Sequence, residues 1–385
     1  MSSQYSSQVR ILLLCRSLDV GGTERQLVVL AEGLHKQGHD VAVMVFYANG
    51  ALEKRLHKSG IPVFDLRKSG RWDVLPFFMR AVQVTWKLKP RVIYAFLSTP
   101  NVLTAFLKPI SPNARVVWGV RASNMDLDRY DWLSRVSYRI ECRLSRFADL
   151  IICNSRAGLE YAAAHGFPRG RMTVIPNGID TERFKPDVAT REHMRAEWGI
   201  AENEMLIGLV ARLDPMKDHP TFLRAASILA QERSDVRFVC VGDGSGPYKN
   251  ELSHLASDLG LDGQLIWAGA RHDMPAVYNA LDIATSSSYS EGFPNTIAEA
   301  MGCGVLCVVT DVGDAKRIVG DTGYVVDPGN PRALVSAWQE ALEAGGVEKA
   351  SRGQRARKRV IEHFSLERLI GETARVLEAA VTTGP

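Results

Sequence analysis

Two glutamates separated by seven residues, Glu291 and Glu299, form the most informative group in the sequence. Between them lie the residues that open a predicted helix: Phe293, Pro294, Asn295 and Thr296. The amides of these residues, except that of the proline, would face a ligand from the positive end of the helix. Glu291 would then lie in the loop at the mouth of a cleft, and Glu299 about a turn inside the helix. The alternative is that both acids only cap the helix and complement its dipole.

Two cations, Arg212 and Lys217, surround one loop directly after a predicted strand over 206–211. Open α/β sheets bind ligands at the carboxyl ends of their strands. Two positive charges at such a place could hold a diphosphate leaving group without a metal ion. The alternative is a solvated pair on the surface, which charge alone does not exclude.

A glycine pair, Gly21 and Gly22, follows a predicted strand over 10–15 and precedes a predicted helix over 23–37. Glycines let the backbone approach a ligand closely, and the helix N-terminus offers N–H groups to an anion. The pair does not form a G-x-G-x-x-G fingerprint, which argues against a dinucleotide site and against an NAD-dependent dehydrogenase. A tight turn without a ligand is the alternative interpretation.

The elements that would position these residues alternate between short apolar runs and amphipathic helices. Strands are predicted over 10–15, 40–46, 91–96, 114–120, 150–153, 206–211, 236–241, 265–268, 283–286 and 305–310. Helices are predicted over 23–37, 74–88, 221–231, 247–259, 295–301, 332–344 and 366–380. This rhythm predicts an α/β protein of two Rossmann-like, doubly wound domains facing across a cleft. We expect a first domain over 1–185, a second over 186–365, and a C-terminal helix within 366–385 that packs back on the first.

Length and composition agree with that organisation. The chain has 385 residues, 46% of them hydrophobic, which is enough for two cores. A net charge of +4 is too weak to indicate a nucleic-acid partner. The six cysteines are dispersed, which indicates free thiols in a reducing compartment. With no recognisable signal peptide and no run of about 18 apolar residues, the sequence predicts a cytoplasmic protein whose membrane contact is at most peripheral.

The motifs taken together resemble the retaining glycosyltransferases of family 4, the "group one" enzymes of the GT-B fold. This family includes many bacterial polysaccharide and lipid-linked sugar transferases. The resemblance covers nearly the whole chain and rests on these segments in family order: Gly21-Gly22 with Glu24, Asn177-Gly178-Ile179-Asp180, Arg212 with Lys217, Gly242-Asp243-Gly244, Glu291 to Glu299, Asp311-Val312-Gly313 and Gly323-Tyr324-Val325-Val326.

The resemblance implies a role for each matching residue. Arg212 and Lys217 would hold the donor diphosphate and stabilise its charge as it leaves. Glu291 would contact the transferred sugar, and Glu299 the ribose hydroxyls. Arg271 would contact the nucleotide base. The amides after Glu291 would add to sugar and phosphate binding, and the glycine loop of the first domain would close over the diphosphate.

The resemblance also implies the reaction. A sugar would pass from a nucleotide-sugar to a hydroxyl of a glycan or lipid-linked acceptor, with retention of configuration and without a protein nucleophile. UDP is the favoured nucleotide, GDP stays open, and no cofactor is expected.

The chain departs from the family at one place. Many members carry a histidine near the sugar after the fourth strand of the first domain, and Arg121 stands at that position here. An arginine cannot act as a general base because it stays protonated. Arg121 could fix the sugar, meet the diphosphate or bind an anionic acceptor, and the alternative is a structural contact.

Two further segments allow competing interpretations. Asp126-Leu127-Asp128 imitates the Asp-x-Asp signature of metal-dependent transferases, but it lies away from the inferred donor site, so we predict no metal. Residues 129–147 repeat arginines among aromatic and aliphatic residues, which on a helix could rest on an anionic membrane. A core-packed helix with a solvated basic side is the alternative.

Two other functions compete with transfer. A nucleotide-sugar epimerase would interconvert a donor without an acceptor, although the two cations and two acids favour transfer. A non-catalytic protein that binds a sugar nucleotide or acts as a scaffold is the second competitor. Retention of all four charged residues speaks against lost activity.

Overall fold

The computed structural model describes residues 8–70, 72–121 and 132–382, and its contacts divide the chain into two compact units. Unit 1 comprises Met1–Gly178 and Leu366–Pro385, and unit 2 comprises Ile179–Ser365. The division falls earlier than the predicted boundary at 185. The reason is local, because the Ile179 amide donates a hydrogen bond to the Phe364 carbonyl (2.7 Å) and so belongs with unit 2.

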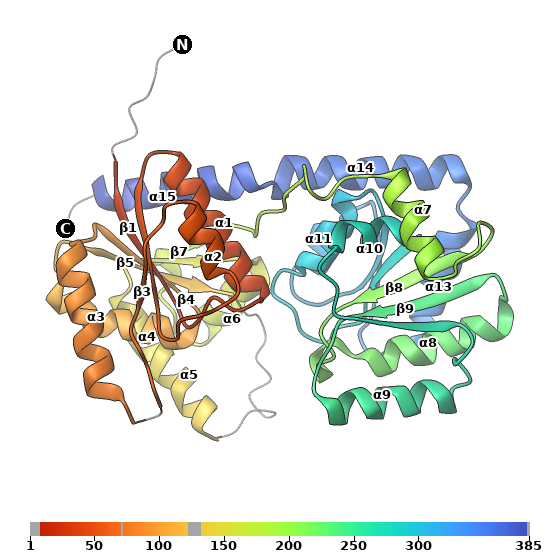
Figure 1. Cartoon of the computed structure of the whole chain (residues 1–385), viewed down its shortest axis with the longest axis horizontal. Helices are drawn as coiled ribbons and strands as arrows, with labels where there is room; N and C mark the ends of the chain where they lie inside the picture. The colour runs from red at the N-terminus through yellow and green to blue at the C-terminus, as the bar shows by residue number, and fades with distance from the viewer. Residues whose placement is uncertain (1–7, 71, 122–131, 383–385) are drawn as a thin grey trace, which may run out of the picture. The chain divides into compact units, whose positions relative to one another are not determined.

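Unit 1 is built on a parallel sheet with the strand order β3-β2-β1-β4-β5-β6-β7 (Figure 1). Its strands are β1 (Arg10–Cys15), β2 (Asp40–Val45), β3 (Val63–Asp65), β4 (Val92–Phe96), β5 (Arg115–Val120), β6 (Leu150–Cys153) and β7 (Met172–Val174). Its helices are α1 (Gly22–Lys36), α2 (Glu53–Lys58), α3 (Val74–Leu88), α4 (Ser98–Leu107), α5 (Trp132–Leu144), α6 (Arg156–Ala164) and α15 (Leu366–Thr382), with 3-10 turns η1 (Lys108–Ile110), η3 (Ser145–Phe147) and η4 (Arg169–Arg171).

Alternate residues of β1 separate the two faces of this sheet. Ile11 and Leu13 pack with α1, α2 and α15, whereas Leu12 and Leu14 pack with α3 and α4. This is the period of two expected of a strand that is buried on both faces. Helices therefore cover both sides, as Figure 1 shows for α1 and α3.

The C-terminal helix α15 belongs to unit 1 by its contacts. It packs against α1, where a side chain at Gly33 would meet Ile370 at 2.2 Å. Leu369 and Leu377 enter the same core cluster as β1. The last helix thus completes one face of the first sheet.

Unit 2 repeats the architecture with the strand order β10-β9-β8-β11-β12-β13. Its strands are β8 (Met205–Val210), β9 (Val236–Val241), β10 (Leu265–Gly269), β11 (Ile283–Ser286), β12 (Leu306–Thr310) and β13 (Tyr324–Val326). Its helices are α7 (Val188–Glu197), α8 (His219–Glu232), α9 (Gly246–Asp258), α10 (Met274–Ala280), α11 (Asn295–Gly302), α12 (Ala315–Val319), α13 (Pro331–Glu343) and α14 (Gly346–Phe364), with the 3-10 turn η5 (Pro215–Lys217).

The predicted fold class is confirmed, because each unit is a parallel sheet flanked by helices. All strands predicted from sequence are present within a residue or two. The short strands β3, β7 and β13 were not predicted as strands, since three residues are too few for an apolar run to stand out. Across the described residues, none of the helices combines the length and the apolar character that a membrane span requires.

Candidate active site

A lysine and a glutamate of unit 2 form the centre of the candidate site. Lys217 lies on η5 after β8, Glu291 follows β11, and these strands are neighbours in the sheet. The Lys217 Nζ donates a hydrogen bond to Glu291 Oε1 at 2.5 Å. The two side chains are only 19% and 12% exposed, so little solvent screens the pair. Two predicted site residues from distant parts of the sequence are therefore brought together at the carboxyl ends of parallel strands.

A run of serines after β11 links the loop that carries Lys217 to the loop that carries Glu291. Ser288 Oγ donates to Glu291 Oε1 (2.7 Å), and Ser287 Oγ donates to the Lys217 carbonyl (2.9 Å). Thr310, at the end of β12, donates to the Ser288 carbonyl (2.6 Å). Sequence reasoning missed these hydroxyls, although serines crowded at the carboxyl end of a predicted strand were a usable signal.

Two glycines of the family motifs permit close backbone packing around the pair. Gly313 has φ +57°, and a Cβ there would lie 2.1 Å from the Glu291 carbonyl oxygen. Gly242 has φ +147°, and a Cβ there would lie 1.9 Å from the Ala211 carbonyl oxygen. Both positions require glycine, because another residue would be strained and would collide with backbone.

The second acid, Glu299, lies on α11 as predicted and is held from α10. The Tyr278 hydroxyl donates to Glu299 Oε2 at 2.7 Å, and Tyr278 is itself fully buried. Tyr278 was not singled out from the sequence, where it looks like any other core aromatic. A carboxylate that a buried hydroxyl orients can accept further hydrogen bonds from a ligand.

The segment that opens α11 is anchored in the core. Pro294 is the N-cap, and Asn295 and Thr296 form the first turn. The Phe293 ring is buried and packs edge-on against Phe364, with centroids 5.4 Å apart. The positive end of the helix dipole lies at this anchored end, which can therefore receive an anion.

The second predicted phosphate ligand, Arg212, differs from Lys217 in its surroundings. Its side chain is 73% exposed, and Nη2 lies 3.4 Å from Asp214. Asp214 also accepts a hydrogen bond from the Met216 amide (3.0 Å), which shapes η5. Arg212 is thus a solvated cation at the loop surface, and Lys217 is the partly buried one.

A buried histidine, His219, stands two residues after Lys217 at the start of α8. Burial and the nearby Lys217 charge lower the pKa of His219 to about 4. The imidazole is therefore neutral at pH 7 and adds no charge to the site. Sequence reasoning did not single it out.

Arg271 lies in a separate cluster of unit 2. It donates to Asp273 (2.5 Å) and to Glu197 (2.8 Å), and these bonds raise its pKa. The predicted contact with a nucleotide base would require Arg271 to exchange one of these partners.

The predicted site residues of unit 1 lie at the carboxyl edge of its sheet. Arg121 donates to Asn177 Oδ1 (2.9 Å) and to the Tyr94 hydroxyl (3.0 Å), and it stacks on Phe96 at 4.7 Å. Arg121 thus makes the structural contacts that were one of its predicted alternatives. These contacts leave its predicted roles toward ligand untested.

The glycine pair begins α1, as predicted. Gly21 is the N-cap and Gly22 the first helical residue. A Cβ at Gly21 would meet the Glu24 carboxylate at 2.1 Å, so that carboxylate folds over the start of the helix. The positive end of α1 is therefore already complemented in part by an acid.

No three His, Cys, Asp or Glu side chains within the described ranges are grouped so that they could hold a metal ion. The Asp-x-Asp motif Asp126-Leu127-Asp128, for which the sequence predicts no metal, lies outside the described residues. Metal independence stays a prediction.

Family comparisons cover both units. Residues 20–183 match the family described as "Glycosyltransferase Family 4", and residues 190–359 match "Glycosyl transferases group 1". Together the two matches include the residues of the Lys217–Glu291 site and the glycine pair.

Individual relatives extend over most of the chain. The putative glycosyltransferase EpsF of Bacillus subtilis is 29% identical over 315 residues, which are 80% of this chain and 80% of EpsF. D-inositol 3-phosphate glycosyltransferase of Rhodococcus opacus is 27% identical over 87% of this chain and 71% of its own length. HepE of Anabaena, solved with UDP-glucose, superposes with a TM-score of 0.85 and 26% identity over 97% of this chain and 100% of HepE. The protein therefore belongs to the group 1 glycosyltransferases of family 4, with the GT-B fold.

Proposed function

We propose that this glycosyltransferase moves a sugar from a UDP-sugar to a hydroxyl of a glycan or lipid-linked acceptor in polysaccharide or glycoconjugate biosynthesis, with retention of configuration and without a metal. HepE, which shares the fold at 26–27% identity, has been solved with UDP, with UDP and glucose, and with UDP-glucose. A galactosyltransferase of Escherichia coli, 29% identical over 43% of this chain and 44% of its own length, is named for a UDP-Gal donor and a diphosphoundecaprenol-linked acceptor. These relatives support the donor and acceptor classes.

The observation that carries the proposal is the Lys217–Glu291 pair beside the N-terminus of α11. A donor diphosphate can draw the Lys217 ammonium to itself, since a phosphate presents more charge than one carboxylate. Glu291, still bonded to Ser288, could then accept hydrogen bonds from hydroxyls of the sugar. Glu299, oriented by Tyr278, would do the same for the ribose. Cation and helix dipole together would stabilise the leaving diphosphate where a metal does so in other transferases.

Retention fits a front-face attack in which a donor phosphate oxygen takes the proton of the acceptor hydroxyl. Glu291 keeps its hydrogen bond from Ser288 when Lys217 turns to the diphosphate, and the proposal assigns it to hydroxyls of the sugar rather than to covalent attack. Arg121 cannot take the proton, since it stays charged. The proposal therefore assigns no covalent intermediate to the protein.

The proposed setting is the cytoplasm, where nucleotide-sugars are available as donors. Its support is that all six cysteines are free thiols, which suits a reducing compartment.

The test is a thermal-shift screen of UDP, GDP, ADP and their sugar conjugates, with and without EDTA, on the full chain. We expect UDP and one UDP-sugar each to stabilise the protein, and to do so to the same extent with EDTA as without it. A ligand concentration of about 100 times Kd should raise the free energy of unfolding by roughly 2.7 kcal/mol. Lys217→Ala should reduce this stabilisation to about half or less, whereas Lys249→Ala, which changes an exposed lysine of the same unit, should keep it.

Product analysis separates the competing functions. NMR of the glycosidic product should show the anomeric configuration of the donor, and inversion would refute the proposed mechanism. An altered UDP-sugar formed without any acceptor would favour an epimerase. A shift with no turnover on any acceptor would favour a non-catalytic binding protein, and a shift that needs a divalent ion would refute metal independence.

A further inference from the structure

A row of large apolar side chains lies exposed on helix α3 of unit 1. Trp72, just before the helix, is 90% exposed, Leu75 is 71% exposed and Trp86 is 74% exposed. Met79 lies between them and is also exposed. The spacing of four and seven residues puts Leu75, Met79 and Trp86 on one side of the helix, and Trp72 lies in the turn that precedes it.

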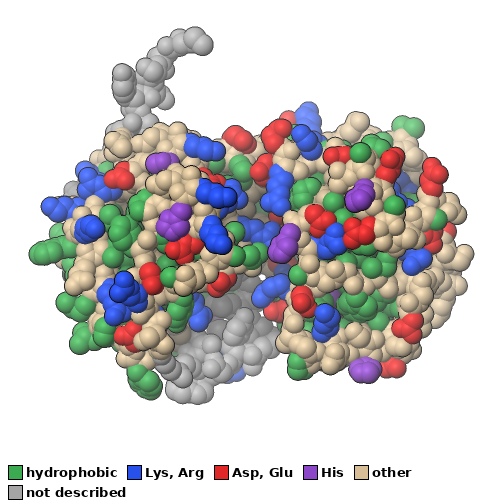
Figure 2. Space-filling model, in the orientation of Figure 1, with side chains coloured by type: hydrophobic (Ala, Val, Ile, Leu, Met, Phe, Trp, Pro, Cys, Tyr) green, Lys and Arg blue, Asp and Glu red, His purple; other side chains and the backbone are tan. Residues whose placement is uncertain are grey.

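This row is separate from the side of α3 that packs on the sheet. Phe77, Ala81 and Thr85 are the buried residues of α3, and Phe77 and Ala81 enter the core cluster with β1 and β2. The helix is thus apolar on two sides, one buried and one exposed. Figure 2 shows hydrophobic side chains gathered over the region that α3 occupies in Figure 1.

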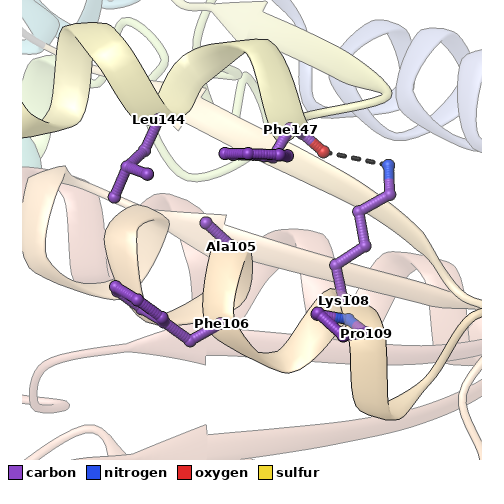
Figure 3. A pocket seen from close by; sticks show the side chains of 6 residues that line it. All are labelled: Ala105, Phe106, Lys108, Pro109, Leu144 and Phe147. Carbon is purple, nitrogen blue, oxygen red and sulfur yellow. Dashed lines mark hydrogen bonds between the residues drawn. The ribbon is translucent and has the colours of Figure 1, made fainter.

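Exposed apolar side chains also lie on the helices next to α3, since α3 contacts α4 and α4 contacts α5. Phe106 of α4, Val136 and Ile140 of α5, and Phe147 of η3 are all exposed. Between α4 and α5 lies a pocket of about 340 Å³ lined by Ala105, Phe106, Lys108, Pro109, Leu144 and Phe147. Figure 3 shows the rings of Phe106 and Phe147 and the side chain of Leu144 around it. We call the exposed side of α3, α4, α5 and η3 the apolar layer.

Basic side chains accompany the apolar layer. Lys87, Arg139, Arg143 and Arg146 are exposed on its helices. The sequences of α3, α4 and α5 contain one acidic residue, Glu141, which is only 5% exposed and hydrogen-bonded to Asn101. Among the residues that the structure describes, two acids at its borders are paired with cations, Asp73 with Arg80 (3.8 Å) and Asp149 with Lys108 (2.7 Å). Asp131, which directly precedes α5 in the sequence, lies outside the described residues. The layer is therefore apolar and positively charged.

We propose that the apolar layer is a membrane-docking surface, on which the α3 row enters the interface of an anionic lipid bilayer. Tryptophans favour the headgroup region, where an apolar ring and its N–H group are both accommodated. Arginine and lysine beside them gain from the negative surface potential of anionic lipid. A two-fold dimer through the same face would place its basic residues opposite one another, which the charges disfavour.

This proposal differs from the contact predicted for residues 129–147. Part of that segment lies outside the described residues, and the rest contributes three arginines together with the exposed apolar Val136, Ile140 and Phe147. The larger apolar contribution comes from α3 and Trp72 before it, a region for which the sequence predicted only an amphipathic helix over 74–88. The proposal concerns binding to lipid and does not depend on the donor or the reaction.

The test is co-sedimentation of the full chain with phosphatidylcholine vesicles, with and without phosphatidylglycerol. We expect binding to the anionic vesicles, weakened when salt rises from about 0.1 M to about 1 M and the Debye length falls from about 10 Å to about 3 Å. Trp72→Ser combined with Trp86→Ser should weaken binding at least about tenfold, because the inserted apolar area is lost. The matched control is Val188→Ser with Val347→Ser, two exposed apolar residues of unit 2, which should bind like the unchanged protein.

Brominated lipid gives an independent readout of depth. It should quench tryptophan fluorescence of the unchanged protein and much less that of the Trp72/Trp86 variant. Unchanged affinity in that variant, or no binding to anionic vesicles, would overturn the proposal. A protein that is dimeric in solution and becomes monomeric on the same two substitutions would assign the layer to a second copy and would overturn it as well.

Discussion

Removing the charge of Glu291 alone should destabilise unit 2 more than removing the charges of Glu291 and Lys217 together. The Nζ–Oε1 distance of 2.5 Å and exposures of 19% and 12% place this pair between a surface and a buried ion pair. Breaking a buried pair from one side costs about 3–5 kcal/mol, and a fully exposed pair contributes about 0–1 kcal/mol. We therefore expect a coupling free energy of about 2 kcal/mol in the cycle of Glu291→Gln, Lys217→Met and the double variant.

The assay has to report on unit 2 rather than on the whole chain, because a protein of two units need not unfold in a single transition. Native-state hydrogen exchange of amides in β8 and β11 meets this need. The same variants should separate binding from transfer. Lys217→Met should weaken UDP binding by roughly 10- to 100-fold, since a hydrogen bond to a charged group contributes about 1.5–3 kcal/mol. Glu291→Gln should bind UDP and fail mainly in transfer.

Two results would refute this reasoning. A coupling below about 0.5 kcal/mol would mean that the two charges act independently. Unchanged UDP affinity in Lys217→Met would remove the lysine from the diphosphate.

Three further predictions concern neighbours of the pair. Tyr278→Phe should lower the free energy of unfolding by about 1–2 kcal/mol and raise the donor KM several-fold, because the 2.7 Å hydrogen bond to Glu299 is lost. Urea unfolding and steady-state kinetics measure the two effects, and an unaltered KM would contradict the prediction. Burial lowers the pKa of His219 to about 4, so as pH falls the unfolded chain protonates this imidazole before the folded chain does. The free energy of unfolding should therefore fall by roughly 3 kcal/mol between about pH 6.5 and about pH 4. Unfolding curves measured over this pH range should show a smaller decrease for His219→Gln, which does not titrate. Gly313→Ala should lower the free energy of unfolding by about 2–4 kcal/mol through backbone strain and collision with the Glu291 carbonyl. The control Gly329→Ala, with φ +69° and open space around it, should lower it by about 1 kcal/mol. Equal losses of stability in thermal unfolding would show that the backbone shifts and avoids the collision.

The sheet and the position of its loops could be predicted from the sequence because parallel strands buried on both faces read as apolar runs. Arg212, Lys217 and Glu291 each follow such a run, and neighbouring strands bring the last two to one edge. The direct bond between Lys217 and Glu291 was not predictable, since sequence spacing does not fix where a flexible side chain ends. The partners of Arg271 were missed for the same reason.

Other features were hidden because the sequence does not say which side of an apolar helix is covered. Helix α3 shows an ordinary amphipathic period, yet Trp72 and Trp86 lie outside the core. Tyr278 shows the converse, since its pattern indicates burial but not which acid its hydroxyl binds. Both cases need the three-dimensional packing.

The discontinuity of unit 1 sets the order in which the newborn chain can finish folding. Residues up to Gly178 emerge from the ribosome before unit 2, but Leu369 and Leu377, which cover α1 and β1, emerge only after it. At about 5–20 residues per second, the first core waits roughly 10–40 s for its cover while unit 2 is synthesised and can fold on its own. During that interval an apolar face of the nascent protein is open to chaperones or to other chains. Truncation of α15 would make this unfinished condition permanent.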